Sequence, residues 1–249
     1  MKIDYFYHNT RRSLQSTEQP EYGAHELLER IGIDLKNYQN GIAKVLAEHA
    51  KLISAAKVLD FGGGNGDLAV RFFNYSDIKP YVLEIDPKLR ENCLRRGFEV
   101  CESFTEVPGS LDMIYSSNVL EHIEDDFGAL LKLHDKLRVG GTLALYLPAF
   151  SCLWTAMDDR VGHYRRYSKK GLLSLLQKLG MTVDQCYYSD SIGFGLSLIY
   201  KLLPYRDGEP SSRSLRCYDR WLFPISRKLD WLTSRYFGKN IFIIARRVS

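Results

Sequence analysis

The sequence lacks any apolar run of the roughly 18 residues that a membrane-spanning helix needs, and its first residues lack the apolar core of a secretory signal. Its five cysteines are scattered and never form a Cys-x-x-Cys pair, which argues against a disulfide framework or a zinc cage and suits a reducing compartment. Internal repeats and low-complexity tracts are also missing. These absences predict a soluble, cytoplasmic, globular protein.

The chain also has little net charge. A formal charge of +4 over 249 residues is too small to indicate a nucleic-acid binder. Between residues 205 and 239, however, eight Lys and Arg residues stand against four Asp and Glu residues. This segment is either a solvated basic surface or a face for a phosphorylated ligand or an anionic lipid surface.

Short β-type runs alternate with helical stretches along the chain. Such alternation predicts an α/β three-layer sandwich, in which helices cover both faces of a mostly parallel sheet. Seven strands are expected, at residues 57–61, 81–85, 99–103, 111–116, 142–147, 183–188 and 241–246. Pro87 suits the first turn of a helix, and Ser168 caps a helix that stops near Gly180. The pair Gly140-Gly141 is expected to close the helix at 125–137.

The whole chain, 1–249, is expected to form a single domain. Residues 1–56 form a helical N-terminal extension, 57–190 a ligand-binding core, 191–240 a helical, basic and aromatic insertion, and 241–249 the last strand. Within the insertion, residues 192–203 are apolar but too short to span a bilayer. This stretch is either a buried helix or a surface helix that meets lipid.

The most informative motif is Asp60-Phe61-Gly62-Gly63-Gly64-Asn65-Gly66, which follows the first strand and precedes a helix. Glycines let the backbone turn tightly and approach a ligand closely. A dinucleotide motif would place its third glycine one residue later, and the carboxylate of Asp60 would repel a pyrophosphate. The motif therefore favours a ligand that carries positive charge.

The ends of the next two strands complete the predicted ligand site. A carboxylate at the end of the second strand can accept hydrogen bonds from both hydroxyls of a ribose. Glu84 is favoured for this role because Asp86 stands where a helix N-terminal carboxylate is expected. Ile85, between them, is assigned to the same site. An adenine is expected near Ser103 and Phe104, although a Phe here also suits the core.

With these residues the chain resembles the class I S-adenosylmethionine-dependent methyltransferases. The resemblance rests on the glycine motif, the ribose acid and the segments 111–114 and 138–141, and covers about residues 57–150. It implies S-adenosylmethionine as cofactor, a Rossmann-like sheet with an antiparallel seventh strand beside the sixth, and a cofactor contact at Asn118.

A narrower resemblance carries a further implication. Segments 117–126, 147–149, 162–167 and 237–240 resemble a bacterial and archaeal methyltransferase group, often found beside sugar transferases that act on polyprenyl phosphates. It implies methyl transfer to O or N of a small-molecule or glycan- or lipid-linked, anionic acceptor. Peripheral membrane contact through 191–240 is a further expectation.

Four residues are candidates for the acceptor side. His122 follows the fourth strand, where open α/β sheets bind ligands, and is either a base or a histidine that orients backbone. His163 is expected to act as the base, and Arg165 or Arg166 to anchor the acceptor bidentately. Alternatively, these residues belong to a loop whose charges pair among themselves.

No metal is expected. Some methyltransferases place Glu-x-x-Glu-His at this point to bind a divalent ion, but the first position here is Asn118, which offers only a neutral oxygen. Two alternatives to a methyltransferase remain, a nicotinamide-dependent oxidoreductase and a non-catalytic partner subunit that binds the cofactor. Cofactor binding and turnover would separate the three.

Overall fold

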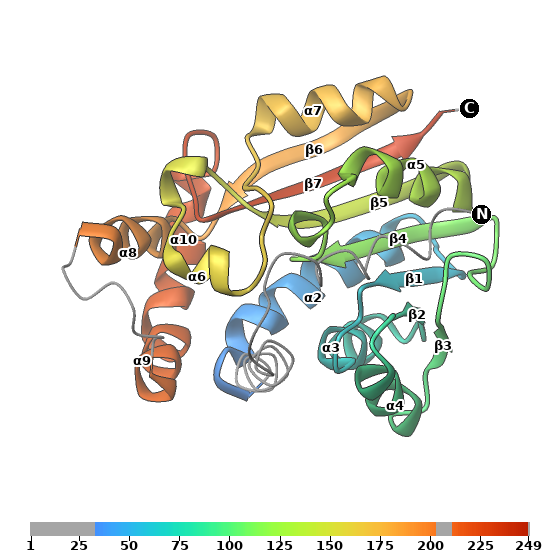
Figure 1. The fold of residues 1–249 in the computed structure, drawn as a ribbon, viewed down its shortest axis with the longest axis horizontal. Helices are drawn as coiled ribbons and strands as arrows, with labels where there is room; N and C mark the ends of the chain where they lie inside the picture. The colour runs from blue at the N-terminus through green and yellow to red at the C-terminus, as the bar shows by residue number, and fades with distance from the viewer. Residues whose placement is uncertain (1–32, 203–210, 249) are drawn as a thin grey trace, which may run out of the picture.

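The computed structural model describes residues 33–202 and 211–248, and they form one seven-stranded sheet between two layers of helices (Figure 1). The strand order is β3-β2-β1-β4-β5-β7-β6. The strands are β1 Val58–Phe61, β2 Tyr81–Leu83, β3 Glu99–Cys101, β4 Leu111–Ser117, β5 Leu137–Pro148, β6 Met181–Ser189 and β7 Asn240–Arg247. β7 runs antiparallel to β5 and β6, and the pairs among β1 to β5 are parallel. The predicted fold class is confirmed.

Each face of the sheet is apolar and covered by its own helices. α5 (Asp126–Lys136) and α7 (Lys169–Lys178) pack on one face. α2 (Lys36–Leu52), α3 (Asp67–Ser76) and α4 (Pro87–Arg95) pack on the other. The near-continuous apolar strands, such as β1 with all four residues buried, are what a sheet covered on both sides requires.

Local helix signals act as the sequence predicts at two helices. Pro87 begins α4, and the Ser168 side chain accepts a hydrogen bond from the Gly171 N–H at the start of α7. The Ser168 hydroxyl satisfies an N–H group of the first helical turn, and proline at the start of a helix has no N–H that could be left unpaired.

The prediction for Gly140-Gly141 is wrong. α5 ends at Lys136 and β5 begins at Leu137, so both glycines lie inside the strand. The pairing of β4 with β5 shifts register between Leu111 and Met113, and Gly140 adopts φ +79° there. A Cβ on Gly141 would stand 2.7 Å from the Leu111 carbonyl oxygen. The glycines therefore accommodate a strand irregularity rather than a helix end.

The insertion between β6 and β7 is helical, as predicted. It contains α8 (Ser191–Leu202), α9 (Ser212–Cys217), the π-turn η4 (Tyr218–Leu222) and α10 (Phe223–Thr233). Asp219 of η4 accepts hydrogen bonds from the first backbone N–H groups of α2, Asn37 at 2.9 Å and Tyr38 at 2.8 Å. This contact fixes the insertion to the N-terminal helix.

α8 packs against α10 and leaves Leu196 and Ile199 exposed. Among the described residues, no helix is both long and apolar enough to traverse a bilayer.

Candidate functional site

The predicted ligand-binding residues gather at the carboxyl ends of β1, β2 and β4. β1 and β4 are neighbours in the sheet. The chain continues from β1 to β2 on one side and from β4 to β5 on the other, so the strand order reverses between β1 and β4. In open α/β sheets the crevice for a ligand forms at such a switch point.

In the glycine loop, residues 62–66, two glycines pack closely against neighbouring side chains and a third borders open space. A Cβ on Gly62 would stand 2.4 Å from Val119, and one on Gly63 would stand 2.3 Å from Val82. Gly64 has φ +55° and nothing within 4 Å of its missing side chain. The first two glycines therefore permit packing, whereas Gly64 borders the space that a ligand can occupy.

Asp60 is the next-to-last residue of β1, just before this loop. Its side chain is 1% exposed, and its Oδ2 has no hydrogen-bond partner among the described residues. Burial raises the pKa of Asp60 to about 8; the Tyr115 hydroxyl opposes the rise and Glu84 adds to it. An acid in this state is poised to receive a cation, which would ionise it and compensate its charge.

The structure places Glu84 and Asp86 in different surroundings. Glu84 is buried under the loop, where Oε2 accepts the Gly64 N–H at 2.8 Å and Oε1 accepts the Asp86 N–H at 2.9 Å. Burial raises the pKa of Glu84, against these backbone hydrogen bonds. Asp86 caps α4 by accepting from Lys88 and Leu89. The Ile85 side chain between the two acids is 41% exposed.

The other proposed cofactor contacts lie at the same edge of the sheet. The Phe104 ring lies 5.5 Å from that of Phe61, and it packs on the core as well. The Ser103 hydroxyl is bonded to its neighbour Thr105. Asn118 is exposed at the end of β4 with φ +54°.

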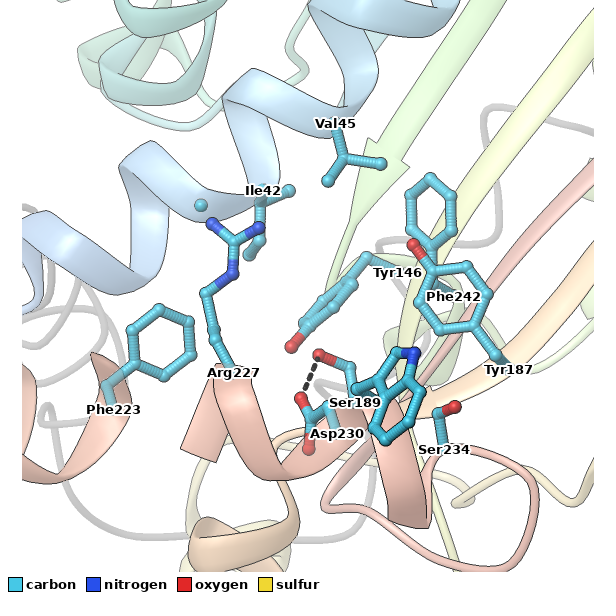
Figure 2. A pocket seen from close by; sticks show the side chains of 12 residues that line it. Ile42, Val45, Tyr146, Tyr187, Ser189, Phe223, Arg227, Asp230, Ser234 and Phe242 are labelled. Carbon is cyan, nitrogen blue, oxygen red and sulfur yellow. Dashed lines mark hydrogen bonds between the residues drawn. The ribbon is translucent and has the colours of Figure 1, made fainter. Parts of the chain in front are cut away.

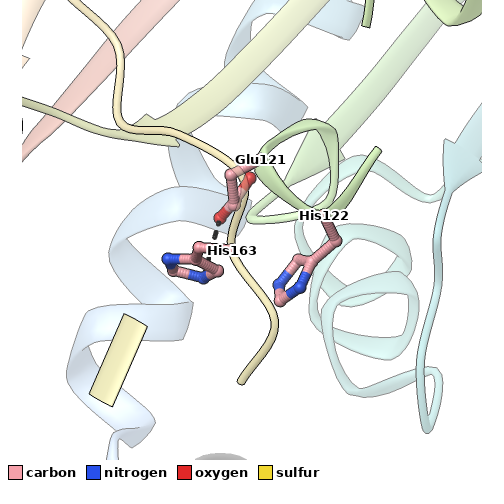
Figure 3. A group of neighbouring side chains, drawn as sticks. All are labelled: Glu121, His122 and His163. Carbon is pink, nitrogen blue, oxygen red and sulfur yellow. Dashed lines mark ion pairs between the residues drawn. The ribbon is translucent and has the colours of Figure 1, made fainter. Parts of the chain in front are cut away.

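A cluster of acid and imidazole groups adjoins the glycine loop (Figure 3). Glu121 and His122 belong to the short helix η2 (Leu120–His122), which follows the Val119 that packs on Gly62. Glu121 is 0% exposed and both of its carboxylate oxygens lack hydrogen-bond partners among the described residues. Burial raises the pKa of Glu121 to about 8, although Arg166 opposes the rise.

Glu121 was not among the residues predicted for the site, although it lies in one of the motifs. The sequence did offer a signal, because Glu121 and His122 are the Glu-His pair of the Glu-x-x-Glu-His pattern and are flanked by the apolar residues Leu120 and Ile123.

His163 is held by a buried carboxylate. Its Nδ1 lies 2.7 Å from Oδ1 of Asp158, which belongs to α6 (Ala156–Arg160), and its Nε2 lies 3.9 Å from Oε1 of Glu121. Arg166 binds both oxygens of Asp158, at 2.8 and 3.0 Å. Burial alone would raise the pKa of Asp158, but the hydrogen bonds from His163 and Arg166 outweigh burial and hold it well below its usual range.

The remaining acceptor-side candidates are close by. The His122 ring lies 4.6 Å from that of His163, edge to face, and burial together with His163 lowers the pKa of His122 to about 4. Arg165 pairs with Asp126 at 2.8 Å and donates to the Glu124 carbonyl. Both arginines proposed as acceptor anchors therefore have carboxylate partners within the chain.

A separate cavity of about 330 Å³ lies between α2, α10 and the sheet (Figure 2). Tyr146, Tyr187 and Phe242 line it from the sheet and Arg227 lines it from α10 (Figure 2). Trp231 of α10 is also among the lining residues. The glycine loop does not line it. Sequence reasoning missed this cavity because its lining comes from five elements far apart in the chain, α2, β5, β6, α10 and β7.

The fold and the site together define a Rossmann-like α/β protein built to bind a nucleoside-type ligand. A family model described as a methyltransferase domain matches residues 35–186, and the chain belongs to this family.

Known proteins agree with this assignment. The chain is 24% identical over 161 residues to methyltransferase str2 of Strobilurus tenacellus, a match that covers 61% of the chain and 57% of that relative's length. The fold is similar to a SAM-dependent methyltransferase of Thermotoga maritima, with TM-score 0.57, 16% identity and coverage of 89% and 95% of the two chains. It is also similar to one from Archaeoglobus fulgidus, with TM-score 0.52, 17% identity and coverage of 82% and 94%.

Proposed function

We propose that the chain is an S-adenosylmethionine-dependent methyltransferase that methylates an O or N atom of its acceptor. The observation that carries this proposal is the buried Asp60 carboxyl beside the glycine loop: its Oδ2 has no hydrogen-bond partner among the described residues and lies 3.7 Å from the position of a Cβ on Gly63. The cofactor has a sulfonium and an ammonium group and no phosphate, so a carboxyl group here attracts it and disfavours a dinucleotide. Glu84 is placed to accept from the ribose hydroxyls.

Glu121, His122 and His163 adjoin this site and would receive the acceptor. Bound S-adenosylmethionine supplies a methyl group on a good leaving group, so the protein mainly has to align the acceptor. His163 is the group best placed to take a proton, because its Nδ1 is held by Asp158 and its Nε2 faces Glu121. Arg165 and Arg166, held by their carboxylate partners, shape the loop that borders the proposed acceptor site.

A glycan- or lipid-linked acceptor and peripheral membrane contact remain part of the proposal. They are supported by exposed side chains on η4 and α10: Trp221 is 61%, Trp231 84% and Leu232 62% exposed. Cations Arg220 and Lys228 are exposed in the same segment. Aromatic and basic side chains together favour an anionic lipid surface.

Vesicle flotation tests this contact. Binding to vesicles that contain phosphatidylglycerol is expected for the wild type and reduced for Trp231→Ala. It should be unchanged for Leu52→Ala, which removes an equally exposed side chain from α2. Equal flotation of all three proteins would contradict a lipid role for α10.

Calorimetry tests the cofactor. S-adenosylmethionine and S-adenosylhomocysteine are expected to bind wild type, NAD is not, and Asp60→Asn is expected to weaken binding of the methionine form most, because only it carries the sulfonium charge. NAD binding would favour the oxidoreductase alternative. Tight cofactor binding without turnover of any acceptor would favour the non-catalytic subunit.

A further inference from the structure

Three side chains of metal-ligating type meet at the carboxyl end of β4 (Figure 3). Glu121 and His122 come from η2, and His163 comes from the loop after α6. One donor atom from each lies within 4.8 Å of the others. Two imidazoles and one carboxylate form a ligand set that first-row divalent transition ions take in proteins, with further positions left open for a substrate.

Glu121 supplies an independent indication of a ligand. It is fully buried, and neither carboxylate oxygen has a hydrogen-bond partner among the described residues. A buried carboxylate without partners is costly, and natural proteins usually pair such a group or use it to coordinate a metal. The 3.9 Å between its Oε1 and His163 Nε2 is too long for a hydrogen bond, yet close to the separation of two ligands on one ion.

Asp158 orients the His163 ring so that its Nε2 is free to bind a metal ion. Its carboxylate accepts from Arg166 through both oxygens and from the Thr155 N–H, so it acts as an acceptor and the ring Nδ1 must donate to it. The lone pair of the imidazole is then on Nε2, which faces Glu121. A carboxylate that holds the second nitrogen of a ligating histidine in this way is usual at zinc sites.

We propose that Glu121, His122 and His163 bind one divalent transition ion of the zinc, cobalt or iron(II) type. Magnesium is a poor match because it prefers oxygen ligands. With metal–ligand bonds of about 2.1 Å, donors on a tetrahedral ion stand roughly 3.4 Å apart. Binding therefore has to draw together donor atoms that now lie within 4.8 Å of one another, Glu121 Oε1 and His163 Nε2 by about 0.5 Å from their 3.9 Å.

This donor set keeps the Glu-His pair of the sequence pattern that led us to expect no metal, as Glu121 and His122, but not its first position. That pattern required the position of Asn118, which is exposed and whose amide donates to the neighbouring Ser117 hydroxyl. The fold brings His163 to the cluster instead, from a loop that reaches η2 through the hydrogen bond from Tyr164 N–H to the Glu121 carbonyl at 2.8 Å.

The role of the ion rests on the proposed function, whereas its binding does not. η2 packs on the glycine loop through Val119 and Gly62, so the ion lies beside the cofactor site. A divalent ion lowers the pKa of a coordinated hydroxyl. The ion then takes over the role proposed above for His163 as base, with His163 as one of its ligands, and the acceptor class that follows is an alcohol or phenol, methylated on oxygen.

Cobalt titration of the full chain tests the site. After treatment with a chelator and dialysis, Co²⁺ is added and its visible absorption followed, with Zn²⁺ competition and Mg²⁺ as comparison. One Co²⁺ per chain is expected, displaced by Zn²⁺ and not by Mg²⁺. Glu121→Gln and His163→Gln are expected to weaken binding roughly tenfold or more. His49→Gln is the matched control, because His49 lies on α2 and bonds Thr142.

Cofactor binding by the same samples checks folding and separates the two proposals. If S-adenosylmethionine binds but Co²⁺ does not, or binds equally to the Glu121 and His49 variants, the metal site is refuted and the methyltransferase proposal stands. If Co²⁺ binds as expected and S-adenosylmethionine does not, the metal site stands and the proposed function fails.

Discussion

Replacing Asp60 by Asn should stabilise the protein while weakening cofactor binding. The pKa of this buried carboxyl is about 8 against an ordinary 3.8. Between these values the folded protein holds a proton that the unfolded chain releases. The free energy of unfolding of the wild type therefore falls as pH rises from about 4 to 8.

The size of this effect follows from the pKa difference. Each pKa unit corresponds to about 1.4 kcal/mol, so between pH 5.5 and 7.5 the wild type should lose roughly 3 kcal/mol of stability through Asp60 alone. Asp60→Asn removes this loss. Its absolute gain at pH 7 is smaller than the full effect, because the new amide is also unpaired and costs about 1–3 kcal/mol. The change of the unfolding free energy with pH is therefore a better test of the Asp60 pKa than the stability at one pH.

Urea unfolding followed by circular dichroism at pH 5.5, 6.5 and 7.5 measures the slope. Asp112→Asn serves as control: burial alone would raise the pKa of Asp112, but Arg138 and two backbone N–H groups lower it, so its titration lies below this range. We expect Asp112→Asn to keep the wild-type slope and Asp60→Asn to reduce it by the roughly 3 kcal/mol due to Asp60, while the part due to Glu121, whose pKa is also raised, remains. Parallel curves for wild type and Asp60→Asn would refute the reasoning that a strained, proton-holding carboxyl awaits a cation.

Three further predictions concern neighbouring elements. Glu84→Ala should weaken S-adenosylmethionine binding in calorimetry at least tenfold. Asp86→Ala should mainly lower the melting temperature, because the lost helix cap reduces the free energy of unfolding by about 1 kcal/mol; the reverse result would exchange their roles. Gly64→Ala and Gly180→Ala both force a side chain into positive φ in open space, at roughly 1–2 kcal/mol each in urea unfolding, but only Gly64→Ala should abolish cofactor binding. Ser168→Ala should cost about 1 kcal/mol of unfolding free energy and leave calorimetric binding unchanged, and a larger binding defect would contradict a pure capping role.

The elements of the cofactor half were predictable because their signals are local. An apolar strand, a glycine turn and a helix follow one another within residues 58–76, and Pro87 and its preceding acid mark the start of α4. The antiparallel β7 came only from family resemblance. Gly140 shows where local rules fail: its position after a helix suggested a helix end, but the pairing of β5 with β4 places it within a strand.

The arrangement of the residues proposed for the acceptor side could not be predicted, because it depends on contacts between distant segments. Arg166 looked available as an anchor, yet the turn after α6 brings it to Asp158. The same turn carries His163 to Glu121, and a parallel bridge between Ala149 and Tyr167 holds the returning chain beside the end of β5. No periodic pattern in the sequence predicts these contacts.

By itself, the sequence determined the α/β layering, the glycine turn and the acids near the ends of β1 and β2, because strand and helix signals act over a few neighbouring residues. Only the tertiary structure decided that Glu84 faces the glycine loop while Asp86 caps a helix, and that Glu121 is buried without a partner next to His163. Burial and charge pairing set the chemistry of these carboxyls, and both depend on which segments the fold places around them.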